Sequence, residues 1–421
     1  MRTAYKCRIY PTPEQAAQLG RTFGCVRLVW NKTLDARHRA YHDDGRTISY
    51  KETDANLAVW KKTEDLRFLS EVSSVSLQQT LRHQHTAFSN FFAGRAKYPR
   101  FKNRDGKQSA HYTRSAFTLR GGRLTLAKQT AALEFVWSWP DVDIAELSPT
   151  MVVISREPDG RWYVTFAVDT TEPEPSAPTG EAVGVDLGVT DFATLSTGET
   201  IANPKNLDRK ARNLKRYQRR MARKQRGSNN RRKAKRKVAR AHRKVRHARA
   251  DFLHRTSTNL VRRADTIAIE DLNVAGMTRS AKRTTEKPGR NVKQKAGLNR
   301  RVLDAAMGEF RRQLEYKTAR AGTTLIVIDR WYPSSKTCSA CGYLLSKLSL
   351  STRAWTCPDC RTRHDRDVNA AKNIRAAGQA AAGQCPGEAC GAGVSPQGSS
   401  LRQSAGKQER SGASPMGIPA P

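Results

Sequence analysis

The spacing of hydrophobic residues changes along the chain, and each change predicts a different kind of element. Residues 3–10 alternate as a strand does. Thr12 and Gln15 then match the two arms of a capping box at a helix start. From there to about Gly94, apolar residues recur every three or four positions, which is typical of amphipathic helices. We therefore predict that residues 12–94 form a helical domain entered from one strand.

Short alternating runs separated by glycine turns replace this pattern between Tyr98 and Thr171. The runs cover residues 117–119, 123–126, 151–155 and 161–166. They predict a small β-barrel-like domain made of residues 1–11 and 95–171, into which the helical domain is inserted. The next segment, residues 172–180, is rich in proline and is expected to be a stiff linker.

Beyond the linker, strands alternate with helical stretches, a pattern that predicts an α/β sheet. The strand candidates are residues 182–186, 191–195, 266–270 and 323–329. We assign residues 181–330 and 364–376 to this α/β domain and residues 331–363 to a small unit of its own. Residues 377–421 contain no aromatic residue and are rich in Ala, Gly, Gln and Ser, which predicts a disordered tail. The fold class expected for the whole chain is multidomain α+β.

The charge of the chain points to a polyanionic partner. Among 421 residues there are 76 Lys and Arg against 38 Asp and Glu, so the net charge is +38. Residues 209–249 contribute 21 of the basic residues and no acidic one. Apolar residues persist at helical spacing on both sides of Gly227, so we predict two basic helices joined by a turn. A solvated charged face is the alternative, but an apolar stripe without counter-charge favours helices that lie along phosphates.

The cysteine spacing predicts a metal site. Two C-x-x-C pairs, Cys338 with Cys341 and Cys357 with Cys360, are separated by 15 residues, and the N-terminus lacks the apolar core of a secretory signal. In the cytoplasm, where we expect the protein, this pattern favours metal over disulfides. A closed shell of four thiolates suits Zn²⁺ and leaves no position for water, so one structural Zn²⁺ per chain is expected. Four free thiols are the alternative.

Three carboxylates stand out by position. Asp186 and Glu270 come at the ends of apolar strands, and Asp367 comes just before a predicted helix. An acid at the end of a buried strand is costly unless it is paired or binds metal. Three acids at one sheet edge could hold two Mg²⁺ ions for phosphodiester hydrolysis. Capping of the helix by Asp367, or of the strand end by Glu270, is the alternative for each acid alone.

These motifs carry a family resemblance. The sequences are Val-Gly-Val-Asp186-Leu-Gly, Ala-Ile-Glu270-Asp-Leu-Asn, the two C-x-x-C pairs, His-Asp-Arg-Asp367-Val-Asn-Ala-Ala, and further Ile-Tyr-Pro-Thr-Pro-Glu-Gln, Val-Trp-Asn, Tyr-Pro-Arg-Phe-Lys at 98–102 and Tyr-Pro-Ser-Ser-Lys at 332–336. Over residues 3–376 the chain resembles the transposon-associated TnpB (OrfB) family, which is related to type V CRISPR effectors. One departure is Arg361, which follows Cys360 where the family usually has glycine, so a left-handed turn there would cost about 1 kcal/mol.

The resemblance implies an RNA-guided DNA endonuclease of a transposable element. Its α/β domain would be a RuvC (RNase H-like) nuclease with Asp186, Glu270 and Asp367 as catalytic magnesium ligands, an inserted basic helical hairpin and a zinc ribbon. The β-rich domain would be wedge-like and the helical domain a recognition domain. The implied partners are a guide RNA derived from the transposon end and double-stranded target DNA with a short adjacent motif. The protein is expected to act as a monomer with its RNA, in the cytoplasm and associated with the nucleoid.

The resemblance also implies nucleic-acid contacts. Tyr50, on the segment before a helix expected at 53–61, and Gln78 match polar positions of the family's recognition domain, although both could be ordinary surface residues. In the basic hairpin, the residues expected to contact phosphates are Arg219, Arg220, Arg223 and Lys224. Two other functions stay open: a nucleic-acid-binding accessory protein, and a transposase that performs strand transfer with the same carboxylates.

Overall fold

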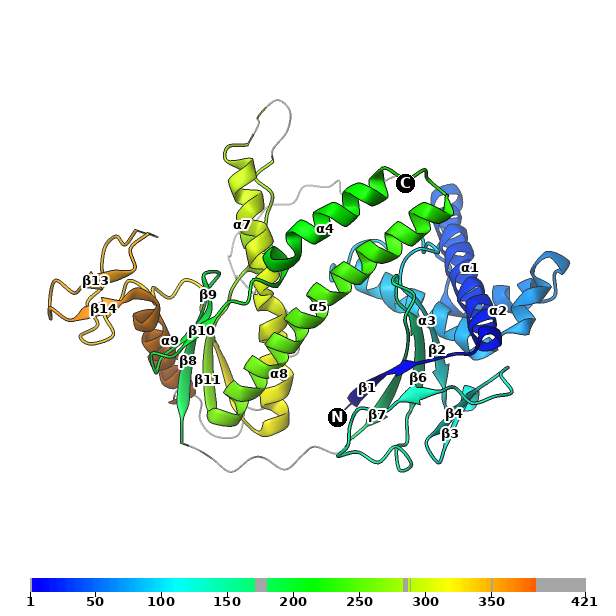
Figure 1. The fold of residues 1–421 in the computed structure, drawn as a ribbon, viewed down its shortest axis with the longest axis horizontal. Coiled ribbons are helices and arrows are strands. Elements are labelled where there is room, and N and C mark those ends of the chain that lie inside the picture. The colour runs from blue at the N-terminus through cyan, green and yellow to red at the C-terminus, as the bar shows by residue number, and fades with distance from the viewer. Residues whose placement is uncertain (1, 171–179, 283–286, 288, 350, 384–421) are drawn as a thin grey trace, which may run out of the picture.

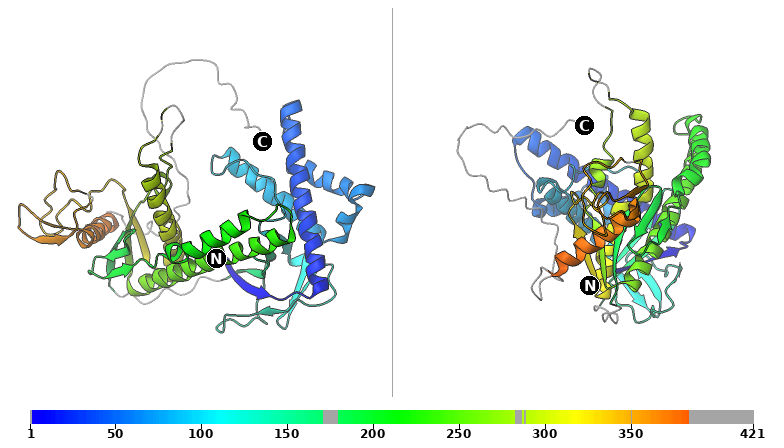
Figure 2. Two further views of the ribbon diagram at one scale, coloured as in Figure 1. Left: turned by 45° about the horizontal axis from the view of Figure 1, so that its top comes forward. Right: turned by 90° about the vertical axis from the view of Figure 1, so that its left-hand side faces the viewer.

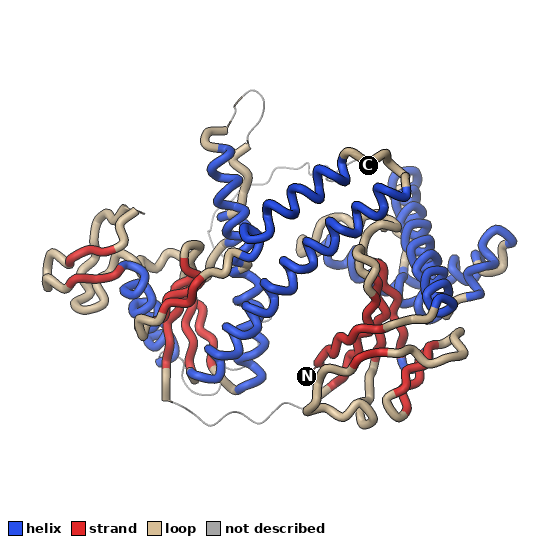
Figure 3. The backbone as a smooth tube through the Cα atoms, viewed as in Figure 1, coloured by secondary structure: helices blue, strands red, loops and turns tan. Residues whose placement is uncertain are grey.

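The computed structural model describes residues 2–170, 180–282, 287, 289–349 and 351–383. Two five-stranded sheets lie apart from each other, and a pair of long helices spans the distance between them (Figure 1, Figure 3). We call residues 2–170 the N-terminal lobe and residues 180–383 the C-terminal lobe. None of the helices in the described part of the chain combines the length and apolar character needed to cross a bilayer.

The sheet of the N-terminal lobe is antiparallel and has the order β2-β6-β7-β1-β5. Its strands are β1 (Arg2–Ile9), β2 (Gln108–Thr113), β5 (Phe135–Val136), β6 (Met151–Arg156) and β7 (Trp162–Asp169), and β3 (Phe117–Arg120) and β4 (Arg123–Leu126) form a separate hairpin. Buried and partly exposed residues alternate along β7, as the sequence pattern predicts. Among the described residues, the edge strands β2 and β5 do not pair with each other, so backbone pairing does not close a barrel.

The helices of this lobe are inserted between β1 and β2. They are α1 (Pro13–Asp44), α2 (Tyr50–Trp60) and α3 (Ser74–Phe92), with 3-10 turns η1 (Glu64–Glu71) and η2 (Arg114–Ala116). The predicted capping box is present: Gln15 N donates to the Thr12 side chain at 3.2 Å, and Thr12 N donates to the Gln15 side chain at 3.0 Å. A second box, between Ser49 and Glu52, starts α2 at Tyr50, so Tyr50 lies inside the helix and not before it as expected.

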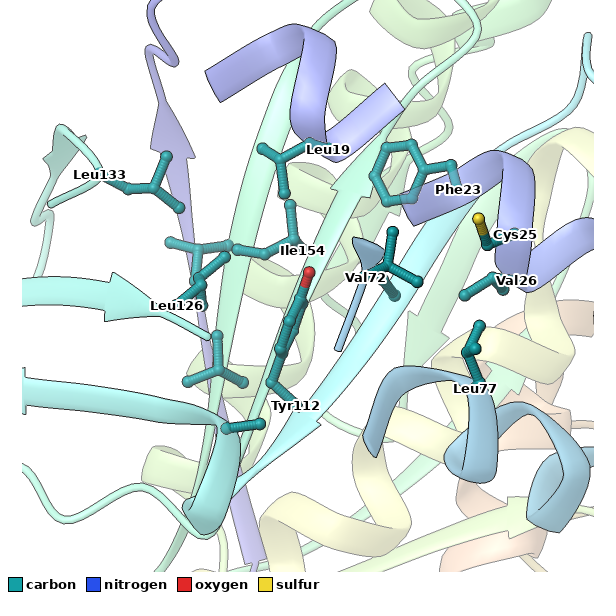
Figure 4. Close-up of a cluster of buried hydrophobic side chains, with 14 of the residues drawn as sticks. Leu19, Phe23, Cys25, Val26, Val72, Leu77, Tyr112, Leu126, Leu133 and Ile154 are labelled. Atoms are coloured by element: carbon teal, nitrogen blue, oxygen red, sulfur yellow. The ribbon is translucent and has the colours of Figure 1, made fainter. Parts of the chain in front are cut away.

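Apolar side chains of α1 and α3 pack onto the sheet. Leu19 and Phe23 of α1 and Leu77 of α3 meet Tyr112 of β2 and Ile154 of β6, and all five are buried (Figure 4). Burial of such side chains contributes about 1.5–3 kcal/mol each, so this core fixes the helices on the sheet.

Two of the motifs that carry the family resemblance are joined in this lobe. Trp30 Nε1 donates to the Arg100 carbonyl oxygen at 3.0 Å. Asn31 and Lys102 exchange two hydrogen bonds, at 3.0 and 2.8 Å. The Val-Trp-Asn and Tyr-Pro-Arg-Phe-Lys sequences therefore join α1 to the loop between α3 and β2.

The sheet of the C-terminal lobe has the order β10-β9-β8-β11-β12, in which β8, β11 and β12 are parallel. The strands are β8 (Ala182–Leu187), β9 (Asp191–Leu195), β10 (Thr200–Ala202), β11 (Thr266–Glu270) and β12 (Thr324–Ile328). The helices are α4 (Asn206–Ala222), α5 (Asn229–Arg263), α6 (Val274–Met277), α7 (Val292–Ala305), α8 (Met307–Ala321) and α9 (Arg366–Gly383), and a small hairpin is formed by β13 (Ala354–Thr356) and β14 (Arg363–Asp365).

Helices cover both faces of this sheet. On one face, Val183, Val185, Ile267 and Ile269 share a buried cluster with side chains of α5 and α8. The alternate residues of the strands face α9 on the opposite side of the sheet. There, Ala268 of β11 and Ile328 of β12 pack against Ile374 of α9. The sheet is therefore a central layer, as expected for an α/β domain.

Two glycines allow α9 to approach the sheet closely. A Cβ atom on Gly184 of β8 would lie 2.1 Å from the Ala371 carbonyl oxygen, and one on Gly378 of α9 would lie 2.6 Å from the Ala268 Cβ. Because no side chain fits in either place, glycine is required at both contacts. The helix also extends to Gly383, so the predicted start of the tail at residue 377 falls within a helix. Residues 384–421 and most of the predicted linker lie outside the described residues.

The predicted basic hairpin is formed by α4 and α5, which run side by side between the lobes (Figure 2). Gly227 has a φ of 84° in the turn, and the Ser228 side chain caps α5. The N-terminal half of α5 contacts the N-terminal lobe through three ion pairs: Arg243 with Asp159 at 2.6 Å, Arg246 with Glu157 at 3.2 Å, and Lys235 with Asp105 at 2.7 Å. The C-terminal half of α5 belongs to the core of the C-terminal lobe.

Candidate active site

Strand pairing places two of the predicted acids side by side. In the parallel ladder between β8 and β11, Val185 is opposite Ile269, so the next residues, Asp186 and Glu270, are neighbours at the carboxyl ends of the strands. Both residues alternate with buried apolar residues, which puts them on the face covered by α9. Asp186 and Glu270 are each half-buried.

The third acid, Asp367, lies in the first turn of α9, on that same face. The sequence left open whether Asp367 caps this helix. Asp365 does so instead: its Oδ1 accepts hydrogen bonds from the backbone N–H groups of Asp367 and Val368, at 3.0 and 2.9 Å. The Asp367 carboxylate makes a contact of 3.4 Å with Arg353, and both side chains are exposed enough for this pair to be weak. The Asp367 carboxylate is therefore not used by the helix cap.

The electrostatics at Asp186 reveal that the three acids lie close together. Burial, and next the negative charges of Glu270 and Asp367, raise the pKa of Asp186 to about 7 from its usual 3.8. At neutral pH this carboxyl is poised between its charged and neutral forms, because burial and the two neighbouring negative charges outweigh the opposing effect of Arg366. A divalent cation with hard oxygen ligands would relieve that repulsion, so the donor set fits Mg²⁺.

Ser334 holds one of these acids. Its hydroxyl, on a buried residue, donates to Glu270 Oε1 at 2.6 Å. The Ser334 carbonyl oxygen in turn accepts from Asn373 Nδ2 at 2.7 Å, and Asn369 Nδ2 donates to the Thr337 carbonyl oxygen at 2.8 Å. Asn369 and Asn373 are buried one turn apart on α9. The helix that carries Asp367 thus also fixes the segment that orients Glu270.

The four predicted cysteines meet at the end of this segment. Their Sγ atoms all lie within 4.8 Å of one another, with Cys338 to Cys360 and Cys341 to Cys357 both at 3.6 Å. Within the described residues this is the one group of three or more such ligands at that spacing. The three carboxylates are more widely spread, which is compatible with a pair of ions about 3.5–4 Å apart.

The two C-x-x-C turns have the same geometry. The residue after the second cysteine donates its N–H to the carbonyl oxygen of the first cysteine, from Gly342 to Cys338 at 2.9 Å and from Arg361 to Cys357 at 3.1 Å. Both residues are left-handed, with φ of 80° and 61°. Arg361 therefore adopts the conformation that the sequence predicts to be costly for it, and the turn still forms.

His364 is a residue that the sequence analysis missed. It is buried, its Nε2 lies 3.0 Å from Cys338 Sγ, and its ring packs against Trp355 with centroids 4.8 Å apart. In the tautomer with a proton on Nε2, this ring would donate a hydrogen bond that stabilises a Cys338 thiolate. Its position next to the cysteine pairs in sequence was the available signal.

The basic residues singled out on the hairpin are exposed. Arg219 and Arg220 end α4, and Arg223 and Lys224 follow it; in the described chain none of the four pairs with a carboxylate. By contrast, Arg243 on α5 is largely buried against Asp159. The hairpin thus has exposed basic residues near its turn, whereas basic residues of α5 that face the N-terminal lobe are paired with its carboxylates.

The two recognition candidates are brought near each other. Gln78 is exposed on α3, and one turn later Arg82 Nε donates to the hydroxyl of the half-buried Tyr50 at 3.3 Å. Arg82 is exposed and was not singled out from the sequence. The structure therefore groups Tyr50, Gln78 and Arg82 on one side of the helical insertion.

Comparisons with known proteins agree with these motifs. The family OrfB_IS605, described as "Probable transposase", matches residues 165–281, and a "Cas12f1-like, TNB domain" matches residues 308–374. A family described as "Helix-turn-helix domain" matches residues 1–46, although this chain forms a strand and one uninterrupted helix there.

Curated relatives match almost the whole chain. A Streptomyces pristinaespiralis protein named "Putative RNA-guided DNA endonuclease" is 52% identical over all of this chain and 98% of its own length. "Putative RNA-guided DNA endonuclease InsQ" of Escherichia coli is 33% identical over 90% of this chain and 92% of its own length. Among solved structures, one described as the "Cas12f1-sgRNA-target DNA complex" shares the fold, with a TM-score of 0.50 and 14% identity over 86% of this chain and 83% of that chain.

The level of identity and the near-complete coverage settle the family. Residues that carry the motifs lie within the matched ranges, and the mixed α/β fold agrees with the solved structure. This chain therefore belongs to the transposon-associated TnpB (OrfB) family.

Proposed function

We propose that this protein is an RNA-guided DNA endonuclease of a transposable element, which hydrolyses phosphodiester bonds in target DNA. The observation that carries the proposal is the gathering of Asp186, Glu270 and Asp367 at one edge of a parallel sheet, in a chain that is 52% identical to a relative named for this activity. Strand transfer by a transposase could use the same acids, but no observation favours it.

The three acids would hold two Mg²⁺ ions, and the sheet would be a RuvC-like nuclease core. Such a metal pair activates a water molecule and stabilises the leaving oxygen of a phosphodiester. The chain's own residues prepare the ligands: Ser334 orients Glu270, and Asp365 caps α9 so that the Asp367 carboxylate is left to the site. Repulsion among the acids favours the cation over a proton once the pH exceeds about 7, where Asp186 ionises.

The four cysteines would hold one structural Zn²⁺. Their Sγ atoms are already clustered, and all four positions of a tetrahedral ion would be taken by sulfur. The Cys360 Sγ lies 3.3 Å from the Thr362 hydroxyl, and hydrogen bonds from Thr362 lower the pKa of this thiol, which favours the thiolate that zinc requires.

The guide RNA, derived from the transposon end, would lie along the exposed tip of the basic hairpin. The helical insertion would act as the recognition domain, with Tyr50 and Gln78 reading the short motif beside the target, and the sheet of the N-terminal lobe would be wedge-like. The protein would act as a monomer with its RNA, in the cytoplasm and on the nucleoid. What supports this division is that Arg219, Arg220, Arg223 and Lys224 pair with no carboxylate among the described residues, whereas the basic residues of α5 that face the N-terminal lobe are neutralised.

An isosteric pair of variants tests the nuclease. Asp367→Asn and Asp365→Asn each remove one charge, and Asn caps a helix nearly as well as Asp. In complex with co-purified RNA, Asp367→Asn should abolish Mg²⁺-dependent cleavage of a guide-matched duplex, whereas Asp365→Asn should cut. Cleavage by Asp367→Asn and not by Asp365→Asn would mean that the wrong acid has been assigned. Joined strands as products, with no RNA of defined sequence in the preparation, would favour the transposase.

A second experiment tests the hairpin. Reversing Arg219 and Arg220 to Glu should weaken RNA binding and flatten the slope of log K against log salt by roughly 0.7–0.9 for each phosphate that is no longer neutralised. The control reverses Arg120 and Arg123, two exposed arginines at the turn between β3 and β4. Equal slopes for both pairs would show that the hairpin tip faces solvent.

A further inference from the structure

One aromatic side chain is displayed to solvent at the edge where the acids lie. Trp331 is 84% exposed, whereas the other six tryptophans of the chain are buried or half-buried. No other large exposed apolar side chain in the described chain lies on β8, β9, β11, β12 or α9. Trp331 is therefore a single ring and not part of a broad apolar patch, which is what a protein-docking surface would need.

The turn that carries Trp331 is held by its own hydrogen bonds. Trp331 N donates to Asp329 Oδ1 at 2.7 Å, Tyr332 N donates to the Asp329 carbonyl oxygen at 3.2 Å, and Ser334 N donates to the Tyr332 carbonyl oxygen at 2.8 Å. Tyr332 packs against the buried cluster of Ile328 and Ile374. The exposure of Trp331 is therefore imposed by an ordered turn.

The residues on either side place this ring beside the acids. Arg330 forms an ion pair with Asp271, the residue after Glu270, and Asp271 also pairs with Arg311 at 2.5 Å. On the other side, Ser334, which is three residues after Trp331, donates a hydrogen bond to Glu270 itself. Trp331 thus lies between two residues that are both fixed on the end of β11.

We propose that Trp331 is a stacking platform for a nucleobase of the single DNA strand that enters the acidic site. The inference rests on the proposed function and adds a residue that holds the strand. Stacking on an exposed ring does not depend on sequence, because every base has a π-face. A base held there would keep the neighbouring phosphate from sliding past the acids, and such positioning lowers the barrier of the cleavage step.

Fluorescence of 2-aminopurine tests the contact without cleavage. The full-length protein with its RNA and zinc, in buffer without Mg²⁺, is titrated into single-stranded DNA that carries one 2-aminopurine. The native protein should quench the probe on binding, and Trp331→Ala should reduce the quenching and weaken affinity about tenfold, within the range expected for loss of one stacked base. Trp331→Phe, which keeps a ring, should restore most of both. The control is Phe92→Ala on α3, an aromatic residue that is 71% exposed and should change neither.

Three outcomes would overturn the inference. Equal quenching and equal affinity for native protein and Trp331→Ala would remove the contact with DNA. Quenching that depends on Trp331 only with an RNA oligonucleotide would assign the ring to RNA. If Trp331→Ala performs guided cleavage in Mg²⁺ with an unchanged KM, the stacking role is refuted. The proposed nuclease function would not be affected by that result. If the native protein cleaves no guide-matched target, the proposed function is wrong. That measurement needs no variant, so it is distinct from the test of Trp331.

Discussion

The acidic edge and the cysteine cluster are both sets of metal-ligand side chains, but they are built in opposite ways. The cysteines come from one segment of 23 residues, and two matched turns bring their Sγ atoms within 4.8 Å before any metal is considered. The acids come from two strands and a helix spread over residues 186–367, and burial together with repulsion among their charges raises the pKa of Asp186 to about 7. The cysteines, which are close together in sequence, can surround a metal ion completely. The acids, which are far apart in sequence, repel one another at an open edge of the sheet.

This difference implies that removing a ligand should have opposite effects on stability at the two places. At a structural metal site, binding free energy is folding free energy, so a lost ligand destabilises the fold. At a site of converging like charges, a lost charge relieves strain, so function falls while stability rises. The following predictions test the contrast, from the largest expected effect to the smallest.

Cys338→Ser should remove about one equivalent of Zn²⁺ per chain and destabilise the C-terminal lobe by several kcal/mol, because apparent zinc-binding free energies reach about 10–16 kcal/mol in small domains. Metal analysis and thermal unfolding check this. The control is Cys7→Ser, at a buried cysteine in the N-terminal lobe, which should keep its zinc. A native protein without zinc would end the comparison.

Gly184→Ala should displace α9 and abolish cleavage, because the added Cβ would lie 2.1 Å from the Ala371 carbonyl oxygen. The expected loss of stability is about 1–3 kcal/mol, as for other overpacked contacts. Urea unfolding and a cleavage assay measure both. In Gly297→Ala, on α7, the added Cβ meets nothing within 4 Å, so this variant should be neutral or slightly more stable. Equal behaviour of the two would refute the close contact.

Asp186→Asn should stabilise the Mg²⁺-free protein at pH 8 by about 2 kcal/mol while it abolishes cleavage. This is roughly half of the ~4 kcal/mol that the full pKa shift would give, because solvent screens a half-buried group. The folded pKa of Asp186 is raised to about 7 from 3.8, so the native chain binds the proton more tightly than the unfolded chain. Its stability should therefore fall as the pH rises between about 4 and 7, and this part of the pH dependence should vanish in Asp186→Asn. Thermal unfolding of the zinc-loaded protein without Mg²⁺, at pH 5 and pH 8, checks the sign. A lower melting temperature of the variant at pH 8 would contradict it.

Ser334→Ala should have the smallest effect: a cleavage rate about tenfold lower and a higher Mg²⁺ requirement, at unchanged zinc content. The reason is the loss of the 2.6 Å hydrogen bond to Glu270, and a bond to a charged group is worth about 1.5–3 kcal/mol. Mg²⁺ titration of the metal-free protein by calorimetry separates binding from rate. Rescue by Ser334→Thr, which keeps the hydroxyl, would distinguish orientation of Glu270 from general packing.

The same contrast explains what could be predicted from sequence. The cysteine cluster could be placed from spacing alone, because each C-x-x-C turn is a local structure. Asp186 and Glu270 could be proposed from strand ends, since parallel strands end at one edge. The choice between Asp365 and Asp367 required the backbone hydrogen bonds of α9, which put Asp365 in the cap.

Residues that act through long-range contacts could not be found in this way. Ser334 reaches Glu270 across 64 positions, and Asn373 reaches Ser334 across 39. No local pattern encodes such pairs, because they exist only after the sheet and α9 have packed together. The display of Trp331 depends likewise on a turn whose neighbours are anchored elsewhere.

The length of α5 has a mechanical consequence. At about 1.5 Å per residue, its 35 residues make a rod about 50 Å long, with one end embedded in the core beneath the sheet and the other fastened to the N-terminal lobe. A helix is stiffer than a flexible linker, so α5 fixes the distance between the two lobes. The strands that end in Asp186 and Glu270 are therefore held at a set distance from the N-terminal lobe.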